Sequence, residues 1–285
     1  MIIQAEASYR TPNETLEEKL IRREMLRQQY MHTFPNYRVQ PEEMEAVFVL
    51  STGKCGTLTM QALLNLSENI FALHEPMPRL WHFCNRTFWQ AGRVEDGATD
   101  VMVRGAREEL IEVANSYGYL YAECAHRLSV YCYHLKRQFP LSKFIFVVRP
   151  MDEVVESSYN WGIFHPNDRY AEGRVRPREH TTWTRSQKLA WYWASLNEFV
   201  ITFLEGLPRE DWHFLDFETL KTADVAELRR LYEWLDVDVP DDRDLRTICA
   251  SRMNAQKEKE AVEKDWHDYD PRAETIYNWI GGNAQ

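Results

Sequence analysis

The feature that most constrains the fold is the stretch AVFVLSTGKCGTLTMQALLNL, residues 46–66. An apolar strand pattern leads into a short loop with two glycines and one lysine, and a helix pattern follows. Such a unit can cradle a phosphate-like group, because the N–H groups of the loop and of the first helical turn converge on one point. The loop lacks the spacing G-x-x-x-x-G-K-[ST] of nucleoside triphosphatases, so the group that it holds is open at this stage.

Further strand and helix patterns alternate along the chain after this loop. Residues 119–124 and 143–149 are predicted strands, and residues 129–139 and 151–164 are predicted helices. This order predicts one α/β domain over residues 1–285, with a central parallel sheet flanked by helices. The other predicted elements are helices at 13–31 (within an N-terminal lead-in, 1–45), 57–66, 186–204 and 223–235, a strand at 212–217 and an apolar stretch at 69–76; the region from there to about residue 100 has no assignment.

The composition argues against several classes of protein. A net charge of −10 and a pI near 5.5 do not fit a nucleic-acid-binding protein, which needs an excess of lysine and arginine. The five cysteines are scattered without a C-x-x-C pair, so they predict neither a disulfide framework nor a zinc site. No segment has the pattern of a signal peptide or the apolar length of a membrane span. These observations predict a cytoplasmic protein without a membrane partner.

Two positions could hold an anion at the carboxyl ends of the predicted strands. In the first loop, Gly53 and Gly56 allow a tight turn and Lys54 adds a positive charge. An ordinary turn with a surface lysine explains these residues equally well. Arg149 ends a buried strand, and Ser157 lies on the helix that follows, so both could face one anion. The alternative for Arg149 is an ion pair with a surface acid.

The two motifs STGKCGT and VVRPMDEVVESSYNWG together resemble the sulfotransferase superfamily, which uses 3′-phosphoadenosine 5′-phosphosulfate (PAPS) as sulfuryl donor and releases adenosine 3′,5′-bisphosphate (PAP). The resemblance extends to QFPLSKFIFVVRP and to HFLDFETLKTADVAELRRLYEWL. It implies a P-loop-NTPase-like sulfotransferase fold and a reaction that needs no metal.

The same resemblance implies roles for individual residues. Lys54 matches the lysine that stabilises charge on the bridging oxygen as the S–O bond breaks, and Arg149 and Ser157 match the 3′-phosphate binders. The segment CASRMNAQKEK resembles the late cofactor-binding loop. The implied cofactor-binding set is Thr52, Gly53, Lys54, Cys55, Gly56, Thr57, Leu58, Arg149, Ser157, Phe217, Arg252 and Asn254. Two positions depart from the family pattern, with Cys55 in place of a serine and Leu58 in place of a threonine whose hydroxyl Thr59 could replace.

Two residues are candidates for the base that removes the acceptor's proton. Glu75 follows the second apolar stretch and resembles the glutamate of many non-cytosolic-type members. His126 follows the third strand, near the spacing of the catalytic histidine in the cytosolic branch, but Cys124 stands where that branch has a lysine. Glu75 is the favoured base, and His126 is its rival or its hydrogen-bonding partner. A capping or salt-bridged role explains Glu75 without any catalysis.

The loop at residues 165–185 is rich in arginine, which is typical of a solvated loop, and in the family the corresponding region often closes as a lid. Its arginines are Arg169, Arg174, Arg176, Arg178 and Arg185.

The sequence as a whole predicts a PAPS-dependent sulfotransferase that acts on a hydroxyl or amine of a small molecule. The high aromatic content and acidic charge favour a secondary metabolite, aromatic or cationic, over a polysaccharide. The alternatives are a nucleotide-dependent small-molecule kinase and an inactive nucleotide-binding module. O- or N-sulfation and a homo-oligomeric state are left open.

Overall fold

A five-stranded sheet forms the centre of the described chain. Its strand order is β2-β3-β1-β4-β5, and every neighbouring pair is parallel. All five residues of β1, the middle strand, are buried, which is why this segment reads as a continuous apolar run. The strands are β1 (Ala46–Leu50), β2 (Ile70–His74), β3 (Leu120–Cys124), β4 (Lys143–Val148) and β5 (Trp212–Asp216). The predicted parallel α/β fold is therefore confirmed.

The computed structural model of the protein describes residues 39–81, 83–90, 97–168, 171–178, 182–251, 262, 265 and 270–283. The predicted helix at 13–31 and the site candidates Arg252 and Asn254 lie outside these residues, as does Arg169.

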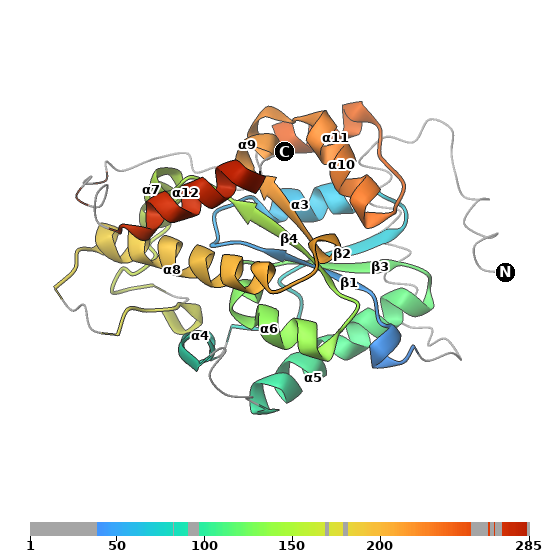
Figure 1. Ribbon diagram of the computed structural model, residues 1–285, viewed down its shortest axis with the longest axis horizontal. Coiled ribbons are helices and arrows are strands. Elements are labelled where there is room, and N and C mark those ends of the chain that lie inside the picture. The colour runs from blue at the N-terminus through green and yellow to red at the C-terminus, as the bar shows by residue number, and fades with distance from the viewer. Residues whose placement is uncertain are drawn as a thin grey trace. The chain divides into compact units, whose positions relative to one another are not determined.

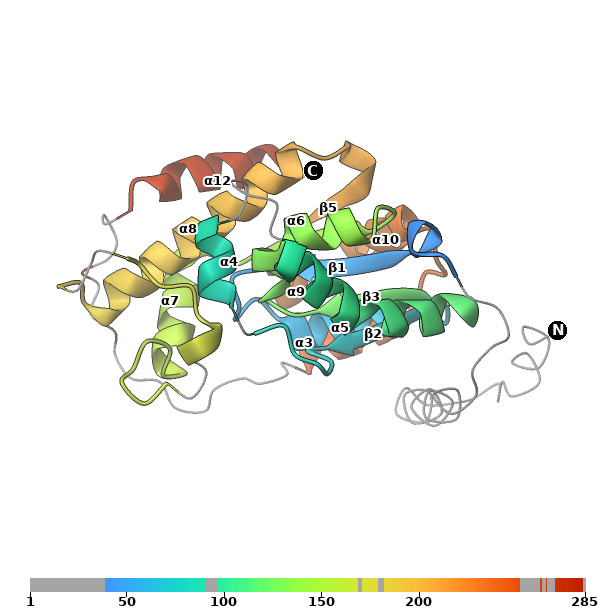
Figure 2. The ribbon, with the colours of Figure 1, turned by 90° about the horizontal axis from the view of Figure 1, so that it is seen from below.

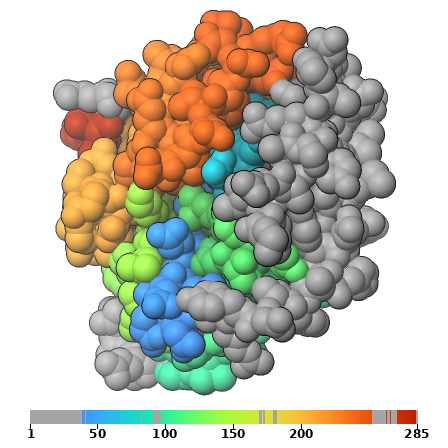
Figure 3. All heavy atoms as spheres, turned by 90° about the vertical axis from the view of Figure 1, so that its right-hand side faces the viewer, coloured from blue at the N-terminus to red at the C-terminus, as the bar shows by residue number. Residues whose placement is uncertain are grey.

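Helices cover both faces of the sheet (Figure 1). One layer contains α3, α9, α10 and α11, and the other contains α5, α6 and α8, with α7 and α12 packed on α8. Figure 2 shows α12 running beside α8, and in Figure 3 the orange segment that contains α10 and α11 covers the upper part of the visible face. The bounds are α3 (Thr57–Leu64), α4 (Cys84–Gln90), α5 (Gly97–Ser116), α6 (Leu128–Gln138), α7 (Met151–Asn160), α8 (Arg185–Glu205), α9 (Phe217–Thr222), α10 (Val225–Leu235), α11 (Asp242–Ala250) and α12 (Arg272–Asn283), with short 3-10 turns at Pro41–Glu43, Ala171–Gly173 and Arg209–Asp211.

Most predicted boundaries agree with these elements to within a few residues. The predicted helix at 151–164 ends earlier, at Asn160, because Gly162 adopts a left-handed conformation with φ of 86°. The unassigned region contains α4 and the start of α5. Helix α8 begins where predicted because Thr184 and Gln187 form a capping box. In the part of the chain that the structure describes, no helix is long and apolar enough to cross a membrane.

A buried ion pair fixes the segment that follows β2. Arg107 on α5 pairs with Glu123 on β3, where Nη2 lies 2.8 Å from Oε1, and both side chains are almost fully buried. The Tyr121 hydroxyl also donates to Glu123. Arg107 Nη1 donates to the carbonyl oxygen of Pro78 at 2.8 Å. The pair therefore links the turn that carries Glu75 and Arg79 to the sheet.

We expect Arg107→Met to lower the free energy of unfolding by about 3–5 kcal/mol, because it leaves the Glu123 carboxylate buried without its partner. Urea denaturation followed by circular dichroism measures this change. The control is Arg107→Met combined with Glu123→Leu, which removes both charges and is expected to recover most of the loss. A single variant as stable as the parent would show that the pair does not hold this turn.

Candidate active site

The loop between β1 and α3 has the conformation of an anion cradle. Gly53, Lys54 and Gly56 all have positive φ, of 89°, 59° and 74°. Gly56 is the N-cap of α3 and provides no side-chain cap, so the N–H groups of the first turn have no acceptor within the helix. The start of the loop is fixed because the Ser129 hydroxyl accepts from the N–H of Ser51 and donates to its carbonyl oxygen, both at 2.8 Å.

The side chains of the loop and of the first turn of α3 each have a defined place. Cys55 is buried, its thiol donates to the Gly53 carbonyl oxygen at 3.1 Å, and burial raises its pKa. This thiol is therefore a packing group. Thr57 hydrogen-bonds to His74 Nε2 at 3.1 Å, so its hydroxyl is already engaged. Leu58 and Thr59 both line the pocket described below.

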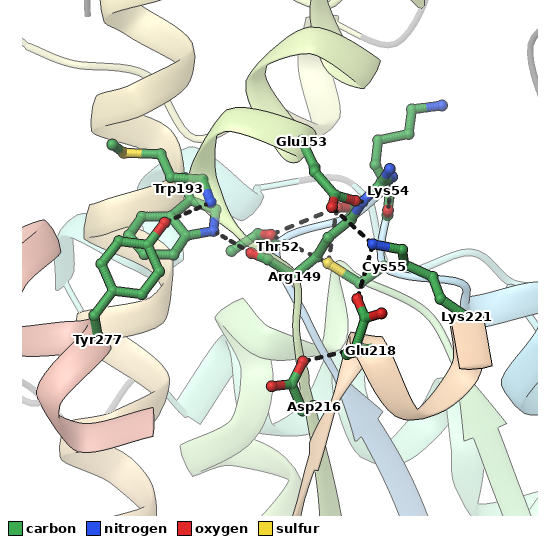
Figure 4. Close-up of polar contacts among 12 residues, drawn as sticks. Thr52, Lys54, Cys55, Arg149, Glu153, Trp193, Asp216, Glu218, Lys221 and Tyr277 are labelled. Carbon is green, nitrogen blue, oxygen red and sulfur yellow. Dashed lines mark hydrogen bonds and ion pairs between the residues drawn. The ribbon is translucent and has the colours of Figure 1, made fainter. Parts of the chain in front are cut away.

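Arg149 connects four segments on one side of the loop (Figure 4). Its Nη1 donates to the Lys54 carbonyl oxygen at 2.7 Å, and its Nε donates to Glu153 at 2.9 Å. The guanidinium also lies 4.6 Å from the ring centroid of Phe217. The backbone carbonyl of Arg149 accepts from Trp193 Nε1 at 2.9 Å. Arg149 thus has both predicted features, a position at the strand end and an acid partner.

A pocket of about 590 Å³ opens at the carboxyl ends of the strands. It forms where loops from three adjacent strands meet, since β1 lies between β3 and β4. The chain runs from β1 to β2 and β3 on one side and then crosses to β4 and β5 on the other. Its lining includes the predicted residues Thr52, Gly53, Lys54, Gly56, Thr57, Leu58, Glu75, His126, Arg149, Ser157 and Phe217. The structure therefore brings these candidates to one pocket, while Cys55 is buried beside it.

Glu75 and His126 are neighbours on the other side of the loop. Glu75 Oε1 accepts from Arg127 Nη1 at 2.9 Å and lies 3.5 Å from His126 Nδ1. Among the described residues, the buried Nε2 of His126 has no hydrogen-bond partner. The imidazole packs against Gly53, where an added Cβ would lie 3.3 Å from the ring. Burial, followed by the charges of Arg127 and Arg174, holds the pKa of His126 well below its usual value, so the ring is neutral at pH 7.

Lys54 is the central cation of the pocket. Its Nζ lies 3.4 Å from the ring centroid of Trp161, at the end of α7. Burial, followed by the charges of Arg174 and Arg149, lowers the pKa of Lys54 to about 7. The ammonium group is therefore poised to gain stabilisation from an anion, which would offset the repulsion by the two arginines.

The loop at 165–185 is not simply solvated. Arg174 is buried with 4% of its surface exposed, pairs with Asp168 at 3.3 Å and lines the pocket. Arg185 starts α8 and donates to the Ile163 carbonyl oxygen at 2.6 Å. Arg176 and Arg178 are exposed, as the solvated-loop interpretation predicts.

Several lining residues were not candidates from sequence. These are His74, Arg79, Arg127, Glu153, Trp161 and Lys221. Arg127 directly follows the candidate His126 in the sequence, and this adjacency could have identified it as a pocket residue. Glu153 and Lys221 form an ion pair at 2.9 Å that lies beside Arg149 (Figure 4). Within the described ranges, no group of three or more histidine, cysteine, aspartate or glutamate side chains could hold a metal ion.

Comparison with known proteins assigns this chain to a family. The model of the sulfotransferase family matches residues 46–241, which include β1 to β5 and every pocket element except α11. The chain therefore belongs to the sulfotransferase family. No curated protein gives a match.

Solved structures share the fold at low sequence identity. A sulfotransferase from Alicyclobacillus acidocaldarius is 15% identical with a TM-score of 0.51, covering 85% of this chain and 96% of that one. Sulfotransferase STF9 from Mycobacterium avium is 12% identical with a TM-score of 0.52, covering 85% and 76%. The sulfotransferase domain of the Synechococcus PCC 7002 olefin synthase is 12% identical with a TM-score of 0.50, covering 87% and 98%.

The pKa of Lys54 can be measured by competitive acetylation with acetic anhydride and peptide mass spectrometry across pH 6–11. We expect the reactivity of Lys54 to rise with a midpoint near pH 7, because its burial and the neighbouring arginines disfavour the charged form. Lys221 is the internal control, since its hydrogen bonds to Glu218 and Glu153 raise its pKa above the ordinary lysine value. A Lys54 midpoint equal to that of exposed lysines would contradict the site electrostatics.

Proposed function

We propose that this protein transfers the sulfuryl group of PAPS to a hydroxyl or amine of a small-molecule acceptor and releases PAP. The observation that carries the proposal is the pocket in which Lys54 lies between Arg149 with Ser157 on one side and Glu75 with His126 on the other. An anion donor and a proton acceptor could thus meet at the lysine. Membership of the sulfotransferase family supports the same reaction.

The donor side of the pocket fits a nucleotide with two phosphate groups. The loop N–H groups and Lys54 would hold the 5′-phosphosulfate, and Arg149 with Ser157 would hold the 3′-phosphate. Arg149 presents only part of its guanidinium, because Nη1 and Nε already bond to Lys54 and Glu153. Phe217 provides an apolar ring beside the same arginine, where the adenosine could rest. The cradle is shaped by the other residues of the loop, Thr52, Gly53, Cys55, Gly56, Thr57 and Leu58. Arg252 and Asn254 remain proposed nucleotide contacts.

On the acceptor side, we assign proton removal to His126. We assign to Glu75 the role of positioning the His126 ring. Glu75 Oε1 already accepts a hydrogen bond from Arg127, and it faces His126 Nδ1, which suits a positioning role. A proton on Nδ1 leaves the lone pair on Nε2, the atom without a partner in the described chain. This reverses the order favoured from the sequence, in which Glu75 came first.

The proposed transfer is in line. The acceptor oxygen or nitrogen forms a bond to sulfur while the bond between sulfur and the 5′-phosphate oxygen breaks, and the acceptor's proton moves to His126 Nε2. Lys54 and the loop N–H groups stabilise the charge that develops on the departing bisphosphate. This scheme uses no metal ion.

A nucleotide-dependent kinase and an inactive binding module are the competing functions. A kinase would need a Mg²⁺ site and the triphosphate loop spacing, and STGKCGT has a different spacing. Thermal shift with ATP–Mg²⁺ and with PAP separates the first alternative. Turnover assays of the His126 and Glu75 variants described below test the second alternative, an inactive binding module.

We expect PAP to bind the protein in isothermal titration calorimetry, and we expect Arg149→Met to raise its Kd by about tenfold or more, because a charge-assisted contact is lost. Affinity should fall as the pH rises from 7 to 9, since unliganded Lys54, with its pKa of about 7, must be protonated to hold the anion. Below pH 7 this proton is already present and the contribution of Lys54 is complete.

Two controls accompany this titration. Lys54→Arg keeps its charge over the whole range and should flatten the pH dependence, and Arg246→Gln, on the exposed face of α11, should leave the Kd unchanged. Failure of PAP to bind the folded parent protein would sink the proposed function.

Removal of the proposed base should lower kcat far more than it changes PAP binding. We expect His126→Ala to lose about 10²–10⁴-fold in the rate of sulfuryl transfer. Glu75→Gln should lower the rate of sulfuryl transfer by less. It should also move the acidic limb of the pH–rate profile, because it changes the group that faces His126 Nδ1 and removes a negative charge near this histidine. If Glu75→Gln abolishes transfer while His126→Asn retains it, the roles are the reverse.

A further inference from the structure

Three arginines line the pocket on the side of Glu75 and His126, and none of them is assigned to the donor. Arg79, Arg127 and Arg174 all line the pocket. We call them the arginine end. Arg79 and Arg127 flank the ring of Trp81, at 5.2 and 5.6 Å from its centroid, and Arg127 also bonds to Glu75. The cations assigned to the donor side, Arg149 and Lys221, are a separate group around Glu153 (Figure 4). Arg149 also lies beside the ring of Phe217.

The ion pairs at this end show which of these charges is available. Glu75 neutralises Arg127 at 2.9 Å, and Asp168 neutralises Arg174 at 3.3 Å. No ion pair of Arg79 is found among the residues that the structure describes, and its side chain is exposed. The arginine end therefore carries one positive charge without a carboxylate partner, next to two arginines that are largely buried.

The two histidines at this end add hydrogen-bonding groups and no further charge. Burial is the main reason that the pKa values of His74 and His126 lie below the usual histidine value. The charge of Glu75 opposes this effect on the pKa of His74, while Arg79 and Arg127 add to it. Arg127 and Arg174 lower the pKa of His126 further. The acceptor side is thus basic through its arginines, with neutral rings beside them.

We infer that the acceptor carries a carboxylate, which Arg79 binds at the arginine end while the acceptor's hydroxyl or amine faces His126. One unpaired arginine matches the single charge of a carboxylate, and the planar guanidinium can bind it through two hydrogen bonds. A cationic acceptor, anticipated from the composition, would meet three arginines at this end, where Glu75 and Asp168 are already paired with Arg127 and Arg174. This inference rests on the proposed function, because it takes the donor to occupy the opposite side.

The test compares matched acids and amides on the full chain saturated with PAP. Calorimetry measures the binding of 4-hydroxyphenylacetate and 6-hydroxyhexanoate, of the amide of each, and of the cation tyramine. We expect at least one acid to bind about tenfold or more tightly than its amide, the value of one charge-assisted contact, and tyramine to bind no better than the amides. Arg79→Gln should abolish the preference, and the exposed Arg246→Gln should retain it.

The outcomes separate this inference from the proposed function. Equal binding of acids and amides, no binding of either acid, or tighter binding of tyramine overturns the inference if PAP binding is intact. An acid preference that survives in Arg79→Gln overturns the assignment to Arg79. If PAP itself does not bind, the proposed function fails and the inference falls with it. An unchanged PAP affinity in Arg79→Gln is required, because this residue is assigned to the acceptor alone.

Discussion

The contacts of Arg149 hold the candidate active site in place. One guanidinium joins the left-handed loop through the Lys54 carbonyl, the start of α7 through Glu153, and α9 through the ring of Phe217. Its carbonyl anchors the same strand end to Trp193 on α8. Helices from both layers are therefore tied to one residue at the end of β4. The loop backbone, which by itself has several residues in uncommon conformations, is fixed by this contact from outside.

Charge is distributed unevenly between the pocket and the rest of this acidic protein. The net charge of the chain is −10, yet the pocket collects its cations at the carboxyl ends of β1 and of its neighbours β3 and β4. Each deeply placed arginine has its own carboxylate, which limits the cost of burial. Burial, followed by repulsion from the neighbouring arginines, lowers the pKa values of Lys54 and His126. An incoming anion relieves this repulsion, so part of the binding free energy comes from the protein itself.

The sequence predicted the elements whose signal is local. The strand, loop and helix at 46–66 and the position of Arg149 follow from patterns within a few residues, and the parallel sheet follows from their alternation. Trp161 and the place of Arg174 beside the pocket could not be predicted in this way, because Lys54 reaches both only through the folded chain. Helix α5 was missed because most residues on its buried face are small, polar or charged, which leaves a weak apolar pattern. The burial of Arg107 on that face depends on Glu123, a partner on another element.

The place of Cys55 has a consequence for oxidative conditions. A cysteine in a nucleotide loop would normally be a candidate for peroxide sensing, since a thiolate beside cations is easily oxidised. Here the sulfur is buried, hydrogen-bonded to the Gly53 carbonyl and kept protonated by its raised pKa. The other four cysteines are buried as well. The thiol of the loop between β1 and α3 is thereby insulated from the redox state of its surroundings, and alkylating reagents should reach it only when the protein unfolds.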